Sequence, residues 1–381
     1  MRKTHSGIVN PQKITEARLS RGYNMAETAA LAGVTRQAMH RYEQGLSVPS
    51  EKVLGILSEK LEFPISFFFN TISLEATSGT TFFRSMKTTE SKYRTMIDIR
   101  CDWVGMIYLY LKELLNLPQV NLPQTELLLR GDVEALSAEA IEECALLLRR
   151  HWKLDEHPIG NLTDLMEHNG IFVFNTQIDN YKLDACHKMI AGRPLVSVTQ
   201  QKESCCRMRF SLAHELGHML LHSYITAEDL GDKDILRRIE NEANRFASAL
   251  LLPRDAFLED VCSSDLNFLL ILKRKWKVSV GAIIYRCKDL GIFSEDQITI
   301  LNRQLSYKRW RTHEPYDDSI PLEQPRLLMT ALKVLFDNNV VTKAEFVSTF
   351  DLPIKELAQL CNVKQSFFSE EPSEINISIV K

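Results

Sequence analysis

One stretch of sixteen residues constrains this chain more than any other. Residues 207–222 read RMRFSLAHELGHMLLH, with His214, Glu215 and His218 in the order H-E-x-x-H. Successive residues of an α-helix turn by about 100°, so positions four apart lie only about 40° apart and both imidazoles face the same way. The pattern predicts a helix with one binding face and one packing face. The apolar positions of the packing face are Leu212, Leu216, Met219 and Leu220.

The two histidines and the carboxylate have the spacing of a zinc site that activates water. Two neutral imidazoles on adjacent turns can fill two tetrahedral positions around Zn²⁺. Glu215 can reach a water on that ion, accept its proton and pass it to the leaving amine of a peptide bond. With 10 histidines in 381 residues, chance produces H-E-x-x-H in about 2 of 100 such chains, so coincidence is the weaker explanation.

A catalytic zinc usually takes a third ligand from the protein. Two candidates follow in a second predicted helix, IENEANRFASALLLP, where Glu240 and Glu242 lie about 160° apart, so that only one can face the metal. Glu240 shares its face with Asn244, whose amide could orient a ligand histidine, so we expect Glu240 to bind the metal. His222 lies a full turn beyond His218, and we expect it and Glu242 to lie outside the set of ligands.

These motifs match a known family pattern. The stretches R-x-R-F-S-L-A-H-E-L-G-H-x-L-L-H and E-x-x-A-N-x-F-A-x-x-L-L-x-P resemble the ImmA/IrrE family of metallo-endopeptidases, as do KLDACH with PLVSV and KVSVGAIIYRCKDLGIFS. The resemblance spans roughly residues 150–300. It implies Zn²⁺ as the cofactor, with Mn²⁺ as an alternative, and a partner repressor as the substrate. Carried over, the metal ligands are His214, His218 and Glu240, and the catalytic carboxylate is Glu215.

The N-terminal segment has the pattern of a helix-turn-helix domain. The runs ITEARLSRG, MAETAALAG, TRQAMHRYEQG and SEKVLGILSEKL predict four short helices, of which the first three end at Gly22, Gly33 and Gly45. The second and third helices are joined by a short turn containing glycine, and the polar face of the third would enter the major groove. The segment resembles the Cro/repressor-type (XRE-family) helix-turn-helix. The predicted DNA-binding residues are Thr35, the N-cap, with Arg36, Gln37, His40 and Arg41, and the predicted core residues are Ala29, Val34, Met39 and Leu54.

Local charge favours a nucleic-acid partner. The first 60 residues contain nine Lys and Arg against five Glu, whereas the whole chain has a net charge of −3. We expect duplex DNA to be bound by a dimer, with Arg36 and Gln37 reading bases. The residues expected to neutralise phosphates are Arg18, Arg21 and Arg41. The alternative is an all-helical protein-interaction module with a solvated polar face.

Other features of the sequence narrow the class of protein. The eight cysteines have no C-x-x-C spacing, so we expect buried thiols rather than disulfides or a cysteine-based metal site. The longest apolar run, Val104–Leu111, is far too short for a membrane span, and the basic start MRKTHSG leads into no apolar segment. These features predict a cytoplasmic protein with no membrane partner. No internal repeat stands out.

The predicted fold is multidomain and mainly α. A helix-turn-helix domain (8–70) is followed by a helical connector (71–150) and an α+β, zincin-like metallopeptidase domain (151–300). Short β-rich runs at 171–174 and 195–198 predict a small sheet in that domain. A helical C-terminal extension (301–381) has no role that the sequence assigns.

These patterns favour one function and leave two alternatives. We expect an intracellular, zinc-dependent, site-specific metalloprotease with a DNA-binding domain, which cleaves a partner transcriptional repressor in stress or mobile-element regulation. One alternative is a transcriptional regulator whose metal domain senses a ligand or partner without cutting. The other is an antitoxin-like component of a toxin pair. Glu215 favours the enzyme, because a purely structural metal site would not require that carboxylate.

Overall fold

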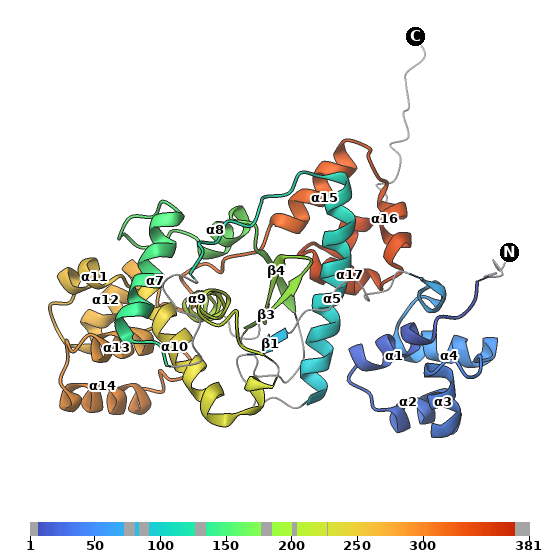
Figure 1. Cartoon of the computed structure of the whole chain (residues 1–381), viewed down its shortest axis with the longest axis horizontal. Helices are drawn as coiled ribbons and strands as arrows, with labels where there is room; N and C mark the ends of the chain where they lie inside the picture. The colour runs from blue at the N-terminus through green and yellow to red at the C-terminus, as the bar shows by residue number, and fades with distance from the viewer. Residues whose placement is uncertain are drawn as a thin grey trace, which may run out of the picture. The chain divides into compact units, whose positions relative to one another are not determined.

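Figure 1 shows the computed structural model of the chain. It describes residues 7–71, 81–83, 91–125, 135–176, 185–199, 204–226 and 228–369. The chain forms two compact units, of which the first comprises residues up to 76, residues 90–104 and residues from 327 onwards. The second comprises residues 77–89 and 105–326. The predicted connector and the predicted C-terminal extension are each divided between the two units. The long helix α5 (Ser91–Leu114) contributes residues to both units.

The first unit begins with four short helices and a 3-10 helix. Thr35 caps the third helix, where its Oγ1 accepts a hydrogen bond from the Ala38 amide at 3.1 Å. Gly33 ends the second helix with a φ of 66°, a left-handed conformation that glycine adopts without strain. The predicted core residues Ala29, Met39 and Leu54 are buried, and Val34 is half-buried. The elements are α1 (Pro11–Ser20), α2 (Met25–Ala32), α3 (Arg36–Glu43), α4 (Glu51–Leu61) and η1 (Ile65–Phe69).

The same unit contains the C-terminal helices. Ser66 of η1 donates a hydrogen bond to Asp351, which directly follows α16, at 2.6 Å. Arg21, which follows α1, forms an ion pair with Glu356 of α17. The part of the predicted extension from residue 327 onwards therefore packs against the helix-turn-helix segment. Its elements are α15 (Leu327–Asp337), α16 (Lys343–Phe350), α17 (Ile354–Leu360) and η4 (Gln365–Phe368).

The pair α17–η4 repeats the conformation of α4–η1, 300 residues later. Each α-helix is followed by a left-handed residue, Glu62 with a φ of 56° and Asn362 with a φ of 53°. The next amide then donates to the carbonyl five residues earlier, at 3.0 Å after α4 and 2.8 Å after α17. Both 3-10 helices contain S-F-F, at 66–68 and 366–368. The two pairs thus share their backbone conformation, whereas most of their side chains differ.

The second unit contains a four-stranded sheet in the order β1-β3-β4-β2. Strands β3 (Ala185–Ile190) and β4 (Arg193–Thr199) form an antiparallel hairpin. Its two turn residues, Ala191 and Gly192, both have positive φ, the conformation that matches the twist of a two-residue hairpin. β2 (Phe172–Thr176) pairs in parallel with β4, and β1 (Thr81–Phe83) pairs antiparallel with β3. The predicted β-rich runs fall largely within β2 and β4.

Helices surround this sheet, and α9 lies at their centre. In Figure 1 α9 is seen nearly end-on, and it contacts β3, β4, α7, α8 and α10. The apolar core of the unit is shared by α7, α9, α10, α12 and α13. The mainly helical fold with a small sheet confirms the predicted fold class. The helices are α7 (Ala138–His151), α8 (Leu162–His168), α9 (Cys205–Leu221), η3 (Asp229–Gly231), α10 (Lys233–Leu251), α11 (Arg254–Asp260), α12 (Leu266–Trp276), α13 (Val280–Asp289) and α14 (Glu295–Tyr307).

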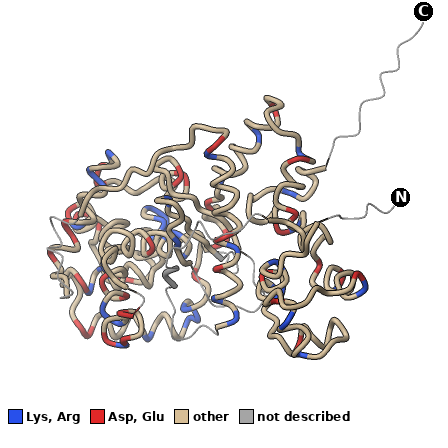
Figure 2. Tube along the Cα trace, turned by 45° about the vertical axis from the view of Figure 1, so that its right-hand side comes forward, with Lys and Arg blue, Asp and Glu red and all other residues tan. Residues whose placement is uncertain are grey.

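The cysteines form no disulfide, as expected, but one of them departs from the expected burial. Figure 2 shows acidic and basic residues interspersed along the trace. All eight cysteines are free thiols, and only Cys262 is exposed. Among the described residues no helix combines the length and apolar character needed to cross a membrane.

Candidate metal centre and DNA-binding helix

The H-E-x-x-H stretch forms the second half of α9, with its leucines packed inward. Leu212, Leu216 and Leu220 are buried in the core of the unit, and Met219 is half-buried against it. The opposite side of α9 meets α10 closely at Gly217. A Cβ at this position would lie 3.2 Å from the Cα of Ala243, so the small residues allow the two helices to approach.

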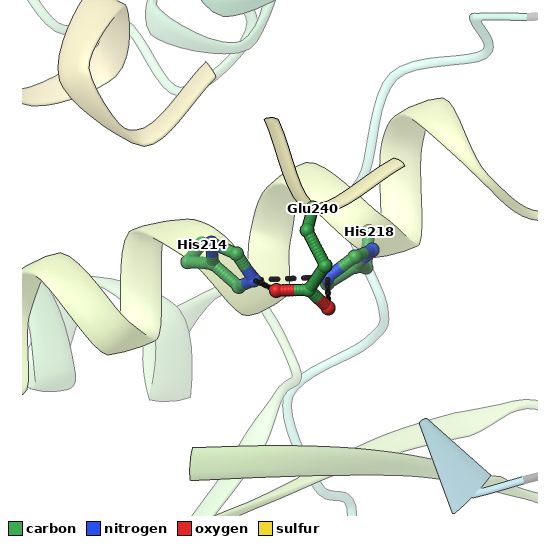
Figure 3. Close-up of side chains that lie close together, drawn as sticks. All are labelled: His214, His218 and Glu240. Carbon is green, nitrogen blue, oxygen red and sulfur yellow. Dashed lines mark hydrogen bonds and ion pairs between the residues drawn. The ribbon is translucent and has the colours of Figure 1, made fainter. Parts of the chain in front are cut away.

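This close approach brings three potential ligands together. The Nε2 atoms of His214 and His218 lie 2.9 Å apart. Glu240, from α10, places one carboxylate oxygen 3.5 Å from Nε2 of His214 and the other 3.6 Å from Nε2 of His218. In Figure 3 both imidazoles project from one helix and the carboxylate reaches them from another segment. The structure therefore assembles the three residues that the sequence proposed as ligands.

The cluster fits a divalent metal ion. Ligand atoms around a tetrahedral zinc, at bonds of about 2.0–2.1 Å, lie about 3.4 Å apart, and the three separations of 2.9, 3.5 and 3.6 Å are close to that value. Burial alone would raise the pKa of Glu240, but its contacts with His214 and His218 lower the pKa to about 2. The carboxylate is therefore ionised at neutral pH, as a metal ligand must be.

Hydrogen bonds at the Nδ1 atoms orient both histidine rings. Nδ1 of His214 donates to Oδ1 of Asn244 at 3.0 Å, so the amide proposed for this task lies within reach. Nδ1 of His218 lies 3.0 Å from Nδ1 of His222, whose Nε2 donates to Glu242 at 2.9 Å. Burial lowers the pKa of His222 to about 4, so its ring is neutral and its Nδ1 accepts from His218. Both ligand histidines thus keep the Nε2 lone pair for a metal.

Glu215 is fully buried and points towards the sheet. Its Oε2 accepts a hydrogen bond from Nδ1 of His187, on β3, at 2.7 Å. Burial raises the pKa of Glu215, but the hydrogen bond from His187 contributes to a net lowering. The other oxygen, Oε1, is buried and has no hydrogen-bond partner among the described residues. Sequence reasoning assigned no role to His187, although it closes the KLDACH motif.

The proposed DNA-reading helix is α3, at the surface of the first unit. Four of the side chains assigned to DNA are exposed along this helix and a fifth is its exposed N-cap, whereas the apolar residue Met39 is buried. This arrangement is the one a helix-turn-helix needs to present polar side chains to base edges. The exposed residues are Thr35, Arg36, Gln37, His40 and Arg41.

Two predicted phosphate contacts are wrong. Arg18 is only 8% exposed, and its guanidinium donates to both oxygens of Glu43, at 2.6 and 2.8 Å. Arg21 donates to the carbonyl of Leu61 at 2.9 Å and pairs with Glu356. Charge-assisted pairs of this kind join helices within the unit. They occupy the guanidinium N–H groups that a phosphate contact would require. Of the three arginines proposed for this role, only Arg41 remains exposed.

Fold and site together define a helix-turn-helix protein with an α+β domain that carries a two-histidine, one-carboxylate cluster. Residues 166–288 match the peptidase family model described as the IrrE N-terminal-like domain. Residues 14–68 match the model described as Helix-turn-helix. The chain therefore joins an XRE-type helix-turn-helix domain to an IrrE/ImmA-like peptidase domain. No curated protein matches the chain.

Proposed function

We propose that the chain is a zinc-dependent, site-specific metallopeptidase that binds duplex DNA and cleaves a partner transcriptional repressor in the cytoplasm. One observation carries the peptidase assignment: Glu215, buried beside His214 in the sequence of α9, adds a carboxylate that metal binding alone does not need. The match to the IrrE N-terminal-like domain supports the same reaction class. The match to the Helix-turn-helix model supports DNA as the second partner.

The residues in and around the cluster have different roles in the proposed reaction. His214, His218 and Glu240 would hold a zinc ion, which would polarise the scissile carbonyl and make the attacking water more acidic. Oε2 of Glu215 is held by His187, whereas Oε1 is the oxygen that can accept the proton of the attacking water. The same carboxylate then returns the proton to the leaving amine. His214 and His218 keep their orientation through the hydrogen bonds on their Nδ1 atoms.

Removal of the metal tests this function. The zinc-loaded chain should cut the partner repressor into two fragments that mass spectrometry identifies, and dialysis against a chelator should abolish cutting, because Glu215 alone does not activate water at neutral pH. Zinc or manganese added back should restore the fragments. Cutting at an undiminished rate by the metal-free chain would contradict a metallopeptidase.

DNA recognition is expected to separate into base and phosphate contacts on α3. Replacing Gln37 with alanine should relax specificity at one base pair by about 1–3 kcal/mol. Replacing Arg41 with glutamine should weaken binding to all sequences and reduce the slope of log affinity against log salt by about 1. Selection from a random duplex pool, followed by salt titrations, measures both effects.

The full chain is the right molecule for this test. The C-terminal helices share a compact unit with the helix-turn-helix segment, so a fragment ending near residue 75 would lose contacts such as that between Ser66 and Asp351. Lys52, exposed on α4, provides a matched control when it is replaced by glutamine. A full chain that selects no sequence, even at low salt, would favour the protein-interaction module instead.

A further inference from the structure

One cavity lies beside the N-terminal half of α9, within the same unit as the metal cluster. It has a volume of about 280 Å³ and is formed by α9, the start of α13 and the segment after α14. Sites for whole small-molecule ligands usually measure about 300–1,000 Å³, so this cavity suits a single side chain better than a cofactor. The residues that define its chemistry are Arg207, Phe210 and Ser211 from α9, with Trp310, Arg311 and Glu314.

Helix geometry places this cavity close to the metal ligands. Phe210 precedes His214 by four residues and Arg207 precedes it by seven, so both lie within about 40° of His214 around α9. Along the axis they lie about 6 and 10 Å from it, at 1.5 Å per residue. An extended peptide advances about 3.3 Å per residue. The metal would lie between His214 and His218, about 3 Å further along the axis. A peptide bound along this face of α9 would therefore place a side chain in the cavity about three or four residues from the bond at the metal.

The cavity presents two guanidinium groups. Arg207 donates to the backbone carbonyl of Arg311 at 2.6 Å, and Arg311 donates to the side-chain oxygen of Asn302 at 2.9 Å. Within the described part of the chain, both thus rest on neutral oxygens rather than on carboxylates. Nε of Arg207 is buried and has no hydrogen-bond partner there. Both arginines keep a full positive charge at the cavity wall.

The acidic residue in the wall does not neutralise these charges. Glu314 accepts a hydrogen bond from the buried ammonium group of Lys273 at 2.9 Å. It also accepts from the backbone amides of Val280 and Gly281 at the start of α13, at 2.9 and 3.2 Å. Lys273 also donates to Asp317 at 2.6 Å. Three cationic side chains therefore lie near two carboxylates, which leaves one positive charge in excess, and the amides at the start of α13 further stabilise the charge of Glu314. Phe210 and Trp310 add apolar surface beside the arginines.

We propose that this cavity binds an acidic side chain, Asp or Glu, of the peptide substrate. The inference rests on the proposed peptidase function. Arg207 and Arg311 would hold the carboxylate, because a planar guanidinium donates two parallel hydrogen bonds to a carboxylate. Phe210 and Trp310 would contact the methylene groups of the same side chain. The cavity thereby selects substrates with an acidic residue at one fixed position, about three or four residues from the cleaved bond.

A library of peptides from a digested proteome tests this specificity. The zinc-loaded full chain should cut peptides that carry Asp or Glu at one fixed distance from the new terminus. Replacing exposed Arg311 with glutamine should lower kcat/KM for such peptides by about 10–100-fold, mainly through KM. Neutral peptides should be cut as slowly as before. Arg303→Gln, exposed on α14 outside the cavity, is the matched control.

A charge-reversal variant separates binding from folding. Arg311→Glu should prefer Lys or Arg at the position where the wild type prefers an acid, a change that a purely structural role would not produce. Two outcomes would overturn this inference while leaving the proposed peptidase function standing. The wild type could cut peptides with no preference for an acidic residue, or Arg311→Gln could retain the preference of the wild type. If the wild type cuts neither the library nor the partner repressor, the peptidase function fails and the inference falls with it.

Discussion

Glutamine in place of Glu215 is expected to slow substrate cleavage by about 10²–10⁴-fold, the usual contribution of a general base. Glutamine keeps the shape of the side chain, and its amide oxygen can still accept the hydrogen bond from His187. An amide oxygen is far less basic than a carboxylate oxygen, so the variant lacks the group that would accept the proton of water. In single-turnover assays with the partner repressor, the loss should appear in the rate of bond cleavage and not in substrate affinity.

The same variant should remain intact in every other respect. It should hold one zinc per chain, because Glu215 is not one of the three proposed ligands, and it should bind DNA like the wild type. Glu259→Gln, at an exposed position on α11, is the matched control and should cut at the wild-type rate. Wild-type cutting by Glu215→Gln would remove this carboxylate from the mechanism.

Loss of the third ligand is the second large effect. Loss of a residue that only hydrogen-bonds to a metal ligand lowers metal affinity by roughly 10–100-fold. Glu240→Ala should lower the affinity for zinc by well over that amount. The reason is that His214 and His218 would be left as the only protein ligands, whereas catalytic zinc usually has three. Competition against a chromophoric chelator measures the affinity, and metal analysis after gel filtration gives the zinc content.

Glu242 provides the matched control on the same helix. Its carboxylate accepts from His222 and from the amide of Leu136, so it supports His218 only through another ring. Glu242→Gln preserves an acceptor and should keep one zinc per chain, with affinity lowered by no more than about 100-fold. Zinc lost from Glu242→Gln but retained by Glu240→Ala would mean that the wrong carboxylate has been assigned.

Helical periodicity explains how much of the site the sequence could predict. Residues four apart share a face, so the sequence alone paired His214 with His218 and Glu240 with Asn244. The same rule placed Leu212 and its partners in the core. In α3, periodicity assigned the exposed polar face, which the structure shows around Arg36 and Gln37. These relations lie within single helices, where sequence spacing fixes geometry.

Contacts between elements could not be predicted in this way. His187 meets Glu215 because the β3–β4 hairpin carries it against α9, and no spacing along the chain encodes that meeting. The bond between His222 and Glu242 depends on the closeness of α9 and α10. Arg18 looked like a surface cation, since helical spacing alone does not show that Glu43 lies opposite it. The likeness of α17–η4 to α4–η1 could not be predicted either, because different side chains share that backbone conformation.

The metal centre is expected to cut a protein rather than to sense a ligand. The most direct measurement compares new protein N-termini in cells that express the wild type or Glu215→Gln at equal levels. A small set of new termini is expected with the wild type, including one in a DNA-binding repressor, and these termini should be lost with the variant. Identical sets with both proteins, or no new terminus with either while the repressor is present, would contradict this expectation and favour a DNA-binding regulator with a sensing metal domain.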